Sequence, residues 1–313
     1  MQQEFISGLQ GIESRHHGCV ATIGSFDGVH LGHQAILSRL CERSKATGLP
    51  SLVMVFEPQP YEFFSKEKAP ARLTRLREKV TALFACGIDR VLCLKFDEHL
   101  RNLSAQAFVQ RVLVNQLGVH HLEIGDDFRF GCDRAGDFAM LQQAGKQLNF
   151  TVCDTRTLLI DGDRVSSTRV RQLLETDQFE YAARLLGQPF NVTGRVIYGQ
   201  QLGRTIGVPT ANIGLGRYRS PVQGVYAVYT QLNGESAVMH GVANVGVKPT
   251  LAGASKPLLE VHLFNFSRDI YGQCLKVTFC QKLRSEQKFD SLAALKMQIQ
   301  QDIHAAKLFF IDQ

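Results

Sequence analysis

The chain of 313 residues contains no tryptophan, no Cys-x-x-Cys pair and no two adjacent Lys or Arg residues. Its eight cysteines do not have the spacing of a zinc site, so we expect reduced and mainly buried thiols. No apolar run approaches the roughly 20 residues that a membrane-spanning helix needs, and the N-terminus lacks the layout of a signal peptide. These absences predict a cytoplasmic globular protein without membrane contact, disulfides or structural zinc.

The formal net charge of +6 comes entirely from the second part of the chain. Residues 187–313 hold 13 Lys and Arg against 7 Asp and Glu, whereas residues 1–186 hold 22 of each class. A basic domain can attract nucleic acid, a membrane surface or a small polyanion. Because the basic residues are not interleaved with aromatics, they do not form an RNA-stacking surface. We therefore expect a small anionic ligand such as ATP, and no nucleic acid.

The first part of the chain shows two alternating hydrophobic patterns. Apolar runs indicate strands over residues 19–23, 51–56, 90–96, 121–124 and 150–153. Helical spacing follows or separates them over residues 34–43, 73–86 and 104–117, with Ser104 as the expected N-cap of the last helix. This alternation is typical of a parallel sheet with crossover helices.

The pattern changes near Leu186-Gly187. Short apolar segments separated by Gly, Pro and Asn turns follow at residues 192–197, 224–231, 238–244, 258–264 and 275–279. Their close succession predicts a small antiparallel barrel, and a helix over residues 291–307 ends the chain. We therefore expect two domains, residues 1–186 and 187–313.

A glycine-rich turn at Gly24–His33 lies between the first of these strands and the following helix. Such a turn places backbone N–H groups at the carboxyl edge of a parallel sheet, where phosphates bind. His30 and His33 lie three residues apart, so both imidazoles could donate hydrogen bonds to phosphate oxygens. The residues expected to contact ATP here are Gly24, Ser25, Phe26 and Gly32. Alone, the turn also fits a structural loop, and the histidines fit a surface face or a metal pair.

A second segment, Val165–Arg171, begins a helix with hydroxyl residues. Ser167, Thr168 and Arg171 could bind triphosphate oxygens through hydroxyl, amide and guanidinium groups. Alone, the segment is also typical of a capped surface helix.

A third motif, Gly199–Asn212, lies within the expected barrel. Gly199, Gly203 and Gly207 would let a loop approach phosphates closely. Thr210 and Asn212, on alternate residues, offer the oxygen ligands that Mg²⁺ prefers. No Lys-Ser/Thr pair follows the glycines, so this is not a Walker A loop. By itself, Pro-Thr-Ala-Asn is also an ordinary turn.

Together these segments resemble one known family. Gly24–Gln34, Phe56–Pro60, Gly125–Gly131 and Ser166–Arg171 are similar to the adenylyltransferase module of bacterial bifunctional riboflavin kinase/FAD synthetases. The His-x-Gly-His element is shared with other nucleotidyltransferases, including aminoacyl-tRNA synthetases. The resemblance continues to the end of the chain. It implies an α/β nucleotidyltransferase domain with a Rossmann-like parallel sheet, then an antiparallel β-barrel riboflavin kinase domain with a C-terminal helix.

The resemblance also implies roles for individual residues. His30 and His33 would contact ATP phosphates, and Asp127 and Phe128 would help to bind the flavin. Gln59 stands where many members have His, and Asp127 stands where some have Asn.

In the second domain, Glu260 matches the catalytic base of riboflavin kinases, although strand alternation alone would direct it to solvent. Mg²⁺ on Thr210 and Asn212 would offset charge on the phosphates, and Asn212 would also contact the flavin. Asn265 stands where the family commonly has Asp.

We therefore expect two consecutive reactions with riboflavin, FMN and ATP as substrates. The second domain would phosphorylate riboflavin to FMN, and the first would transfer AMP from ATP to FMN, giving FAD and pyrophosphate. Two alternatives are a chain with one decayed module, and a basic RNA-binding or synthetase-like protein that adenylates something else. Flavin-dependent release of pyrophosphate would separate the latter from our reading.

Overall fold

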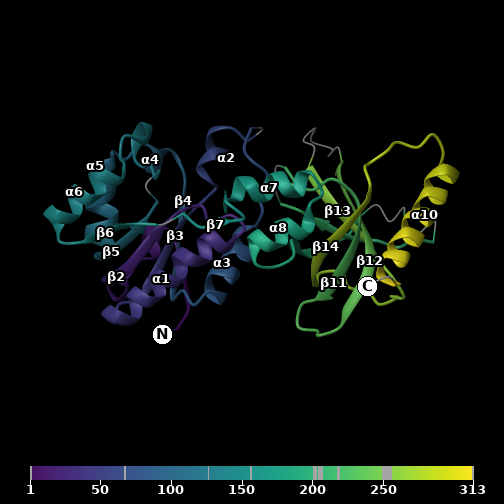
Figure 1. Ribbon diagram of the computed structural model, residues 1–313, viewed down its shortest axis with the longest axis horizontal. Coiled ribbons are helices and arrows are strands. Elements are labelled where there is room, and N and C mark those ends of the chain that lie inside the picture. The colour runs from purple at the N-terminus through teal and green to yellow at the C-terminus, as the bar shows by residue number, and fades with distance from the viewer. Residues whose placement is uncertain are drawn as a thin grey trace. The chain divides into compact units, whose positions relative to one another are not determined.

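The computed structural model describes residues 2–66, 68–125, 127–155, 157–199, 203, 207–216, 219–248 and 256–311 (Figure 1). These residues form two compact units. Unit 1 contains Met1–Ala69 and Leu76–Ser166, and unit 2 contains Pro70–Arg75 and Ser167–Gln313. The helical residues between 167 and 186, which we expected in the first domain, therefore group with the barrel.

Unit 1 is built on a six-stranded sheet in the order β1-β4-β3-β2-β5-β6. The strands are β1 (Glu4–Ser7), β2 (Cys19–Ile23), β3 (Ser51–Glu57), β4 (Arg90–Lys95), β5 (Val119–Ile124) and β6 (Thr151–Asp154). Every pairing in this sheet is parallel. The predicted parallel sheet is thereby confirmed, and the carboxyl ends of its strands lie along one edge.

Helices cover both faces of this sheet, which is why the strands β2, β3 and β4 are nearly continuous apolar runs. On one face Val20 and Val53 pack against Leu37 and Leu40 of α1 (Leu31–Thr47), together with α3 (Leu76–Ala85). The other face packs against α5 (Ala105–Phe108), the π-helical η3 (Val109–Gln116) and α6 (Phe138–Leu148). Ser104 caps α5 as expected, since its hydroxyl accepts the Ala107 N–H at 3.1 Å.

Short elements complete unit 1. They are the helices η1 (Leu9–Gly11), η2 (Ser14–His16), α2 (Pro60–Phe64), α4 (Glu98–Arg101) and η4 (Cys132–Arg134), and a hairpin of β7 (Leu159–Ile160) and β8 (Asp163–Arg164).

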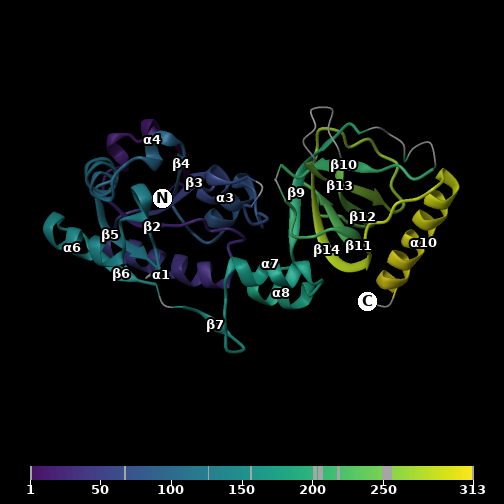
Figure 2. The same cartoon turned by 90° about the horizontal axis from the view of Figure 1, so that it is seen from above.

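Unit 2 is a closed antiparallel barrel in the order β10-β13-β12-β11-β14-β9 (Figure 2). Its strands are β9 (Asn191–Ile197), β10 (Ala211–Gly214), β11 (Gly224–Leu232), β12 (Val238–Lys248), β13 (Lys256–Leu263) and β14 (Cys274–Arg284). The predicted barrel is confirmed. Two helices precede it, α7 (Ser167–Glu175) and α8 (Phe179–Leu186), and Phe179 of α8 packs edge-on against Tyr226 at 5.6 Å between ring centroids.

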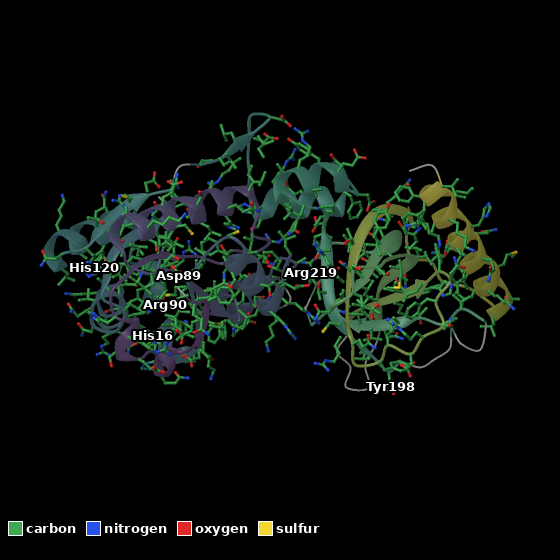
Figure 3. All side chains as sticks on the ribbon, turned by 90° about the horizontal axis from the view of Figure 1, so that it is seen from below. His16, Asp89, Arg90, His120, Tyr198 and Arg219 are labelled. Carbon is green, nitrogen blue, oxygen red and sulfur yellow. The ribbon has the colours of Figure 1, made fainter. Side chains whose placement is uncertain are left out.

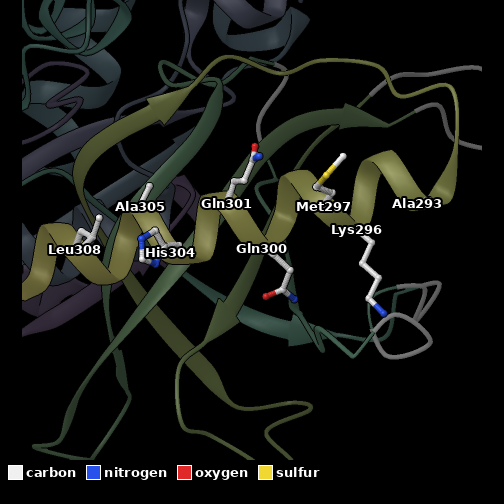
Figure 4. A pocket seen from close by; sticks show the side chains of 8 residues that line it. All are labelled: Ala293, Lys296, Met297, Gln300, Gln301, His304, Ala305 and Leu308. Atoms are coloured by element: carbon white, nitrogen blue, oxygen red, sulfur yellow. The ribbon is translucent and has the colours of Figure 1, made fainter.

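The C-terminal helix, α10 (Leu292–Ile311), lies on the outside of the barrel. Its Ile303 and Ala306 pack on Val225 and Val242. A bidentate ion pair joins the helix to the barrel. Arg284 at the end of β14 donates two hydrogen bonds of 2.8 Å to the buried Asp302 of α10. Ala293, Met297, Ala305 and Leu308 lie on another side of the same helix (Figure 4). Within the described ranges, no helix has the length and apolar character needed to cross a bilayer.

The segment Pro70–Arg75 belongs to unit 2 although it interrupts unit 1 along the chain. Arg75 donates hydrogen bonds to the carbonyl groups of Gly214 and Leu215, at the end of β10. Arg171 of α7 donates to the Ala71 carbonyl at 2.5 Å. A segment from early in the sequence therefore completes the C-terminal unit.

Candidate active sites

The glycine-rich turn of unit 1 joins β2 to α1, as predicted. His30 is the N-cap of α1, and its Nδ1 accepts the N–H of His33 at 3.2 Å. The two imidazole rings stack with centroids 3.6 Å apart and planes 16° apart, and Phe26 lies 4.9 Å from the His33 ring. Because Nδ1 of His30 accepts this bond, the proton of the neutral ring is on Nε2, which can donate to an anion.

The charge state of His33 follows from its surroundings. Burial holds the pKa of His33 well below its ordinary value of 6.5, and the neighbouring basic groups of His30 and Lys79 lower it further. His33 is therefore neutral at physiological pH and can donate one hydrogen bond. Its Nδ1 is buried without a hydrogen-bond partner in the described part of the chain.

The turn itself has an unusual backbone. Phe26 and Val29 have φ values of 45° and 41°, in the left-handed region that residues other than glycine seldom adopt. Such conformations cluster at functional sites. A Cβ atom on Gly32 would lie 3.1 Å from the Val165 carbonyl oxygen and 3.2 Å from the His30 ring, and one on Gly24 would lie 3.1 Å from the Phe26 ring. These glycines thus leave room for neighbouring groups of the turn, while Ser25 is exposed.

An aromatic group that the sequence pattern did not indicate lies at the carboxyl edge of β3 and β4. Phe56, Phe63 and Phe64 all pack against Phe96, with ring centroids 5.3 to 6.0 Å apart. Phe64 is 62% exposed, and Tyr61 of the same short helix is 64% exposed. The sequence shows only that aromatic residues occur near the ends of two strands. It does not show that their rings contact one another.

Gln59 lies at the same edge of the sheet and is the N-cap of α2. The Glu62 carboxylate accepts the backbone N–H of Gln59 at 3.1 Å. The Gln59 side chain is 8% exposed, and Nε2 has no hydrogen-bond partner among the residues that the structure describes. A buried amide donor of this kind is available to a bound acceptor.

Two further groups of predicted residues are less enclosed. Asp127 is exposed and lies 3.5 Å from Arg164, while Phe128 stacks on Phe130 with centroids 5.7 Å apart. Asp126 lies outside the described residues. Ser167 and Thr168 begin α7, and Arg171 follows one turn later; all three belong to unit 2.

In unit 2 the glycines of the third motif, Gly199–Asn212, are required for different structural reasons. Residues 200–202 and 204–206 lie outside the described residues. A Cβ on Gly199 would lie 2.5 Å from Nδ2 of Asn212, so the glycine leaves room for that amide. Gly203 accepts the Val208 N–H at 2.7 Å, and Gly207 has a φ of 81°. Glycine is needed at Gly199 for space and at Gly207 for conformation.

Strand register brings Glu260 and Asn212 together. Glu260 of β13 is directly opposite Asn212 of β10 and Asn244 of β12. Directly opposed residues share one face, with Cβ atoms about 5 Å apart. Leu259 and Val261 are fully buried on the alternate face, inside the barrel, so the half-buried Glu260 lies on the outer face. The outward direction expected from alternation is correct, and it places the carboxylate beside the buried Asn212.

Hydrogen bonds orient the Pro-Thr-Ala-Asn segment. Nδ2 of Asn212 donates to the Thr210 carbonyl at 3.3 Å, which leaves Oδ1 as an acceptor or metal ligand. His262 binds the Pro209 carbonyl through Nδ1 at 2.8 Å. His262 and Asn244 were not predicted, although His262 is two residues after Glu260 and therefore on the same face.

The oxygen donors of Thr210 and Asn212 fit Mg²⁺, which usually takes one or two protein ligands together with substrate phosphates. Across the described ranges, no group of three His, Cys, Asp or Glu residues could hold a metal ion by itself. Tyr198, labelled in Figure 3, lies just beyond β9. Its ring stacks on that of Tyr271 with centroids 3.9 Å apart, and Tyr198 is 71% exposed.

Both halves of the chain match known families. Residues 12–169 match the family model of FAD synthetase, and residues 186–310 match that of riboflavin kinase. The chain is 55% identical over 304 residues to the bifunctional riboflavin kinase/FMN adenylyltransferase of Pseudomonas fluorescens, with 97% of each chain covered. It is 50% identical over 308 residues to the Escherichia coli K12 protein of the same name, with 98% of each covered.

The similarity extends to a solved structure. A crystal structure described as a macrolide-efflux protein from Streptococcus pneumoniae is 28% identical, with a TM-score of 0.75, and covers 96% of this chain and 97% of its own. The whole two-unit fold is therefore shared with that protein.

The neutral state of His33 can be tested by NMR. Its ring nitrogen signals, assigned with a His33→Gln variant, should remain those of a neutral imidazole at pH 6, because burial opposes protonation. The unfolded chain takes up this proton near pH 6.5, so acidification below that pH should destabilise the fold. A titration midpoint at or above 6.5 would contradict the assignment.

Proposed function

The chain belongs to the bifunctional riboflavin kinase/FMN adenylyltransferase family, and we propose that it converts riboflavin to FAD in two consecutive ATP-dependent steps. The C-terminal part is a riboflavin kinase and the N-terminal part is an FMN adenylyltransferase. The observation that carries this function is the match of both family models in one chain. Because the second model is a kinase, the alternative of a synthetase-like or RNA-binding protein loses its support. We retain 186/187 as the functional boundary, since the riboflavin kinase match begins at residue 186.

For the kinase step, we assign Glu260 as the general base. It would accept the proton of the riboflavin 5′-hydroxyl while that oxygen attacks the γ-phosphorus and ADP leaves. The position of Glu260 beside Asn212 supports this role. Thr210 and Asn212 would hold Mg²⁺, which supplies charge neutralisation at the phosphates. His262 would keep the Thr210 segment in place through its bond to Pro209.

For the adenylyl step, the FMN phosphate would attack the α-phosphorus of ATP and release pyrophosphate. Neutral His33, and His30 through its Nε2, would each donate one hydrogen bond to phosphate oxygens as charge develops. Their shared stack and the capping bond support a fixed direction for both rings. The assignment of Ser167, Thr168 and Arg171 to this step rests on the sequence resemblance. No covalent enzyme intermediate is needed.

We assign the flavin of the adenylyl step to the aromatic group at Phe56, Phe96 and Phe64. An isoalloxazine ring is planar and aromatic, and exposed aromatic faces such as Phe64 and Tyr61 suit it. Nε2 of Gln59 would donate to an oxygen of the bound substrate. Asp127 and Phe128 would line the same region from the segment after β5.

We also place the protein in the cytoplasm, where thiols stay reduced. Among the described residues all eight cysteines are free, which agrees with a reducing compartment.

The test of this function is a time course with riboflavin, ATP and Mg²⁺, followed by flavin chromatography. FMN should appear first and FAD second. FMN without FAD would mean that the N-terminal unit is inactive on FMN, and the absence of both products would refute the proposal.

Replacing Glu260 separates the two activities. Glu260→Ala should lower riboflavin phosphorylation by about 100- to 10,000-fold, the usual effect of losing a general base. Conversion of added FMN to FAD should continue. Glu235→Ala, which removes an exposed carboxylate of the same unit paired with Arg268, is the matched control. Equal loss of both activities in Glu260→Ala would argue against its role.

The close approach of Gly199 to Asn212 gives a steric test. A methyl group at Gly199 would displace the Asn212 amide, and a functional group misplaced by about 1 Å lowers the rate by on the order of 100-fold, here the kinase rate. Gly214→Ala is the control, because its Cβ would meet only Ile197, at an ordinary 3.8 Å. Steady-state kinetics with ATP as the varied substrate measures both variants; equal rates would remove Asn212 from the site.

A further inference from the structure

Strand β5 carries two ionisable side chains on a buried face. His121 and Glu123 are 3% and 7% exposed, on the face opposite Leu122 and Ile124. In register, Glu123 pairs with the buried Thr22 of β2, and His121 with Val20. A strand buried on both faces of a parallel sheet is normally apolar throughout, so these two residues need an explanation.

A helix side chain reaches this pair. Nε of Arg39 lies 3.7 Å from Oε2 of Glu123. Arg39 is on α1, whose Leu37 and Leu40 pack on the same face of the sheet. The ion pair therefore links α1 directly to β5.

His121 extends the contact to β6. Its Nδ1 lies 2.6 Å from the Thr151 hydroxyl, which itself donates to the His120 carbonyl at 3.3 Å. The hydroxyl therefore accepts from His121, and the His121 proton is on Nδ1. Nε2 of His121 faces Glu123, 3.9 Å from Oε1.

Stability does not account for this cluster. Nη2 of Arg39, Oε2 of Glu123 and Nε2 of His121 are buried, with no hydrogen-bond partner within the described ranges. Glu123 is buried while the Arg39 side chain is 33% exposed, and the pair lacks a close hydrogen bond. Such a pair contributes little to stability, and its apolar replacement is often neutral or stabilising.

The position of the cluster offers another explanation. Helix α1 begins beside His30 and carries His33 in its first turn, whereas β5 leads into Gly125 and Phe128. Between them, β2 leads into the glycine-rich turn. Because a helix and a strand are rigid, a link between α1 and β5 sets the spacing between the histidines and the segment after β5.

We propose that Arg39 and Glu123 are positioning residues for adenylyl transfer, which hold α1 against β5 so that His30 and His33 meet the substrate phosphates. This inference rests on the proposed function of unit 1. Neither residue touches the reacting atoms.

The test replaces the ion pair with apolar side chains of similar length. Arg39→Met/Glu123→Met should lower kcat/KM for FMN adenylylation by about 10- to 100-fold, as expected for a displaced catalytic group, and mainly through kcat. Riboflavin phosphorylation by the same preparation and the midpoint of thermal unfolding should not fall. Glu42→Met/Arg43→Met, two exposed charges on the same helix, is the matched control.

Three results would overturn the inference. They are an adenylylation rate equal to that of the control, a rate loss matched by a fall in the unfolding midpoint, and equal loss of both activities. If the double variant does not fold, Arg39→Lys keeps the charge but loses the planar donor group, and it should still lower kcat; an unchanged kcat would then refute the proposal. A wild-type protein that forms no FAD would instead refute the proposed function.

Discussion

Backbone pairing in register is the constraint on which both sites depend. In the barrel, register alone places Glu260 opposite Asn212 and Asn244. A slip of one residue would turn the carboxylate into the barrel and bring Leu259 or Val261 to the outer face. In the sheet of unit 1, parallel pairing brings the ends of β2, β3, β4 and β5 to one edge, where the glycine-rich turn, Gln59 and the aromatic group collect.

Within that frame, side chains of the sites are held through the backbone. His30 caps α1, Asn212 binds the Thr210 carbonyl, and His262 binds the Pro209 carbonyl. Each of these bonds orders a loop and fixes the direction of the functional group at the same time. Preorganisation of this kind is what phosphoryl and adenylyl transfer require, because their catalysis is mostly positioning and charge stabilisation.

The elements of the fold could be predicted from the sequence because their signals are local. Apolar spacing identified five of the six strands in the sheet and five of the six in the barrel, and Ser104 marked a helix start. The short strands β1 and β10 were not predicted. Contacts between distant residues could not be predicted: the meeting of Phe56 with Phe96, the approach of His262 to Pro209 and the ion pair of Arg39 with Glu123 depend on tertiary packing. The π-helical segment Val109–Gln116 could not be predicted either, because apolar spacing does not distinguish a π-helix from an α-helix. The roles of the individual site residues remain predictions.

The segment Pro70–Arg75 has a consequence for how the protein is made. Arg75 binds the carbonyl of Leu215, which is 140 residues later in the chain. Arg75 therefore leaves the ribosome well before its partner is made. Domains usually fold in the order in which they are synthesised. Here the segment Pro70–Arg75 is made with the N-terminal unit but finds its partners only after Arg171, Gly214 and Leu215 have been synthesised. A gene fragment that begins at the kinase domain would encode a barrel without this segment, so the boundary in the sequence is not a boundary for folding.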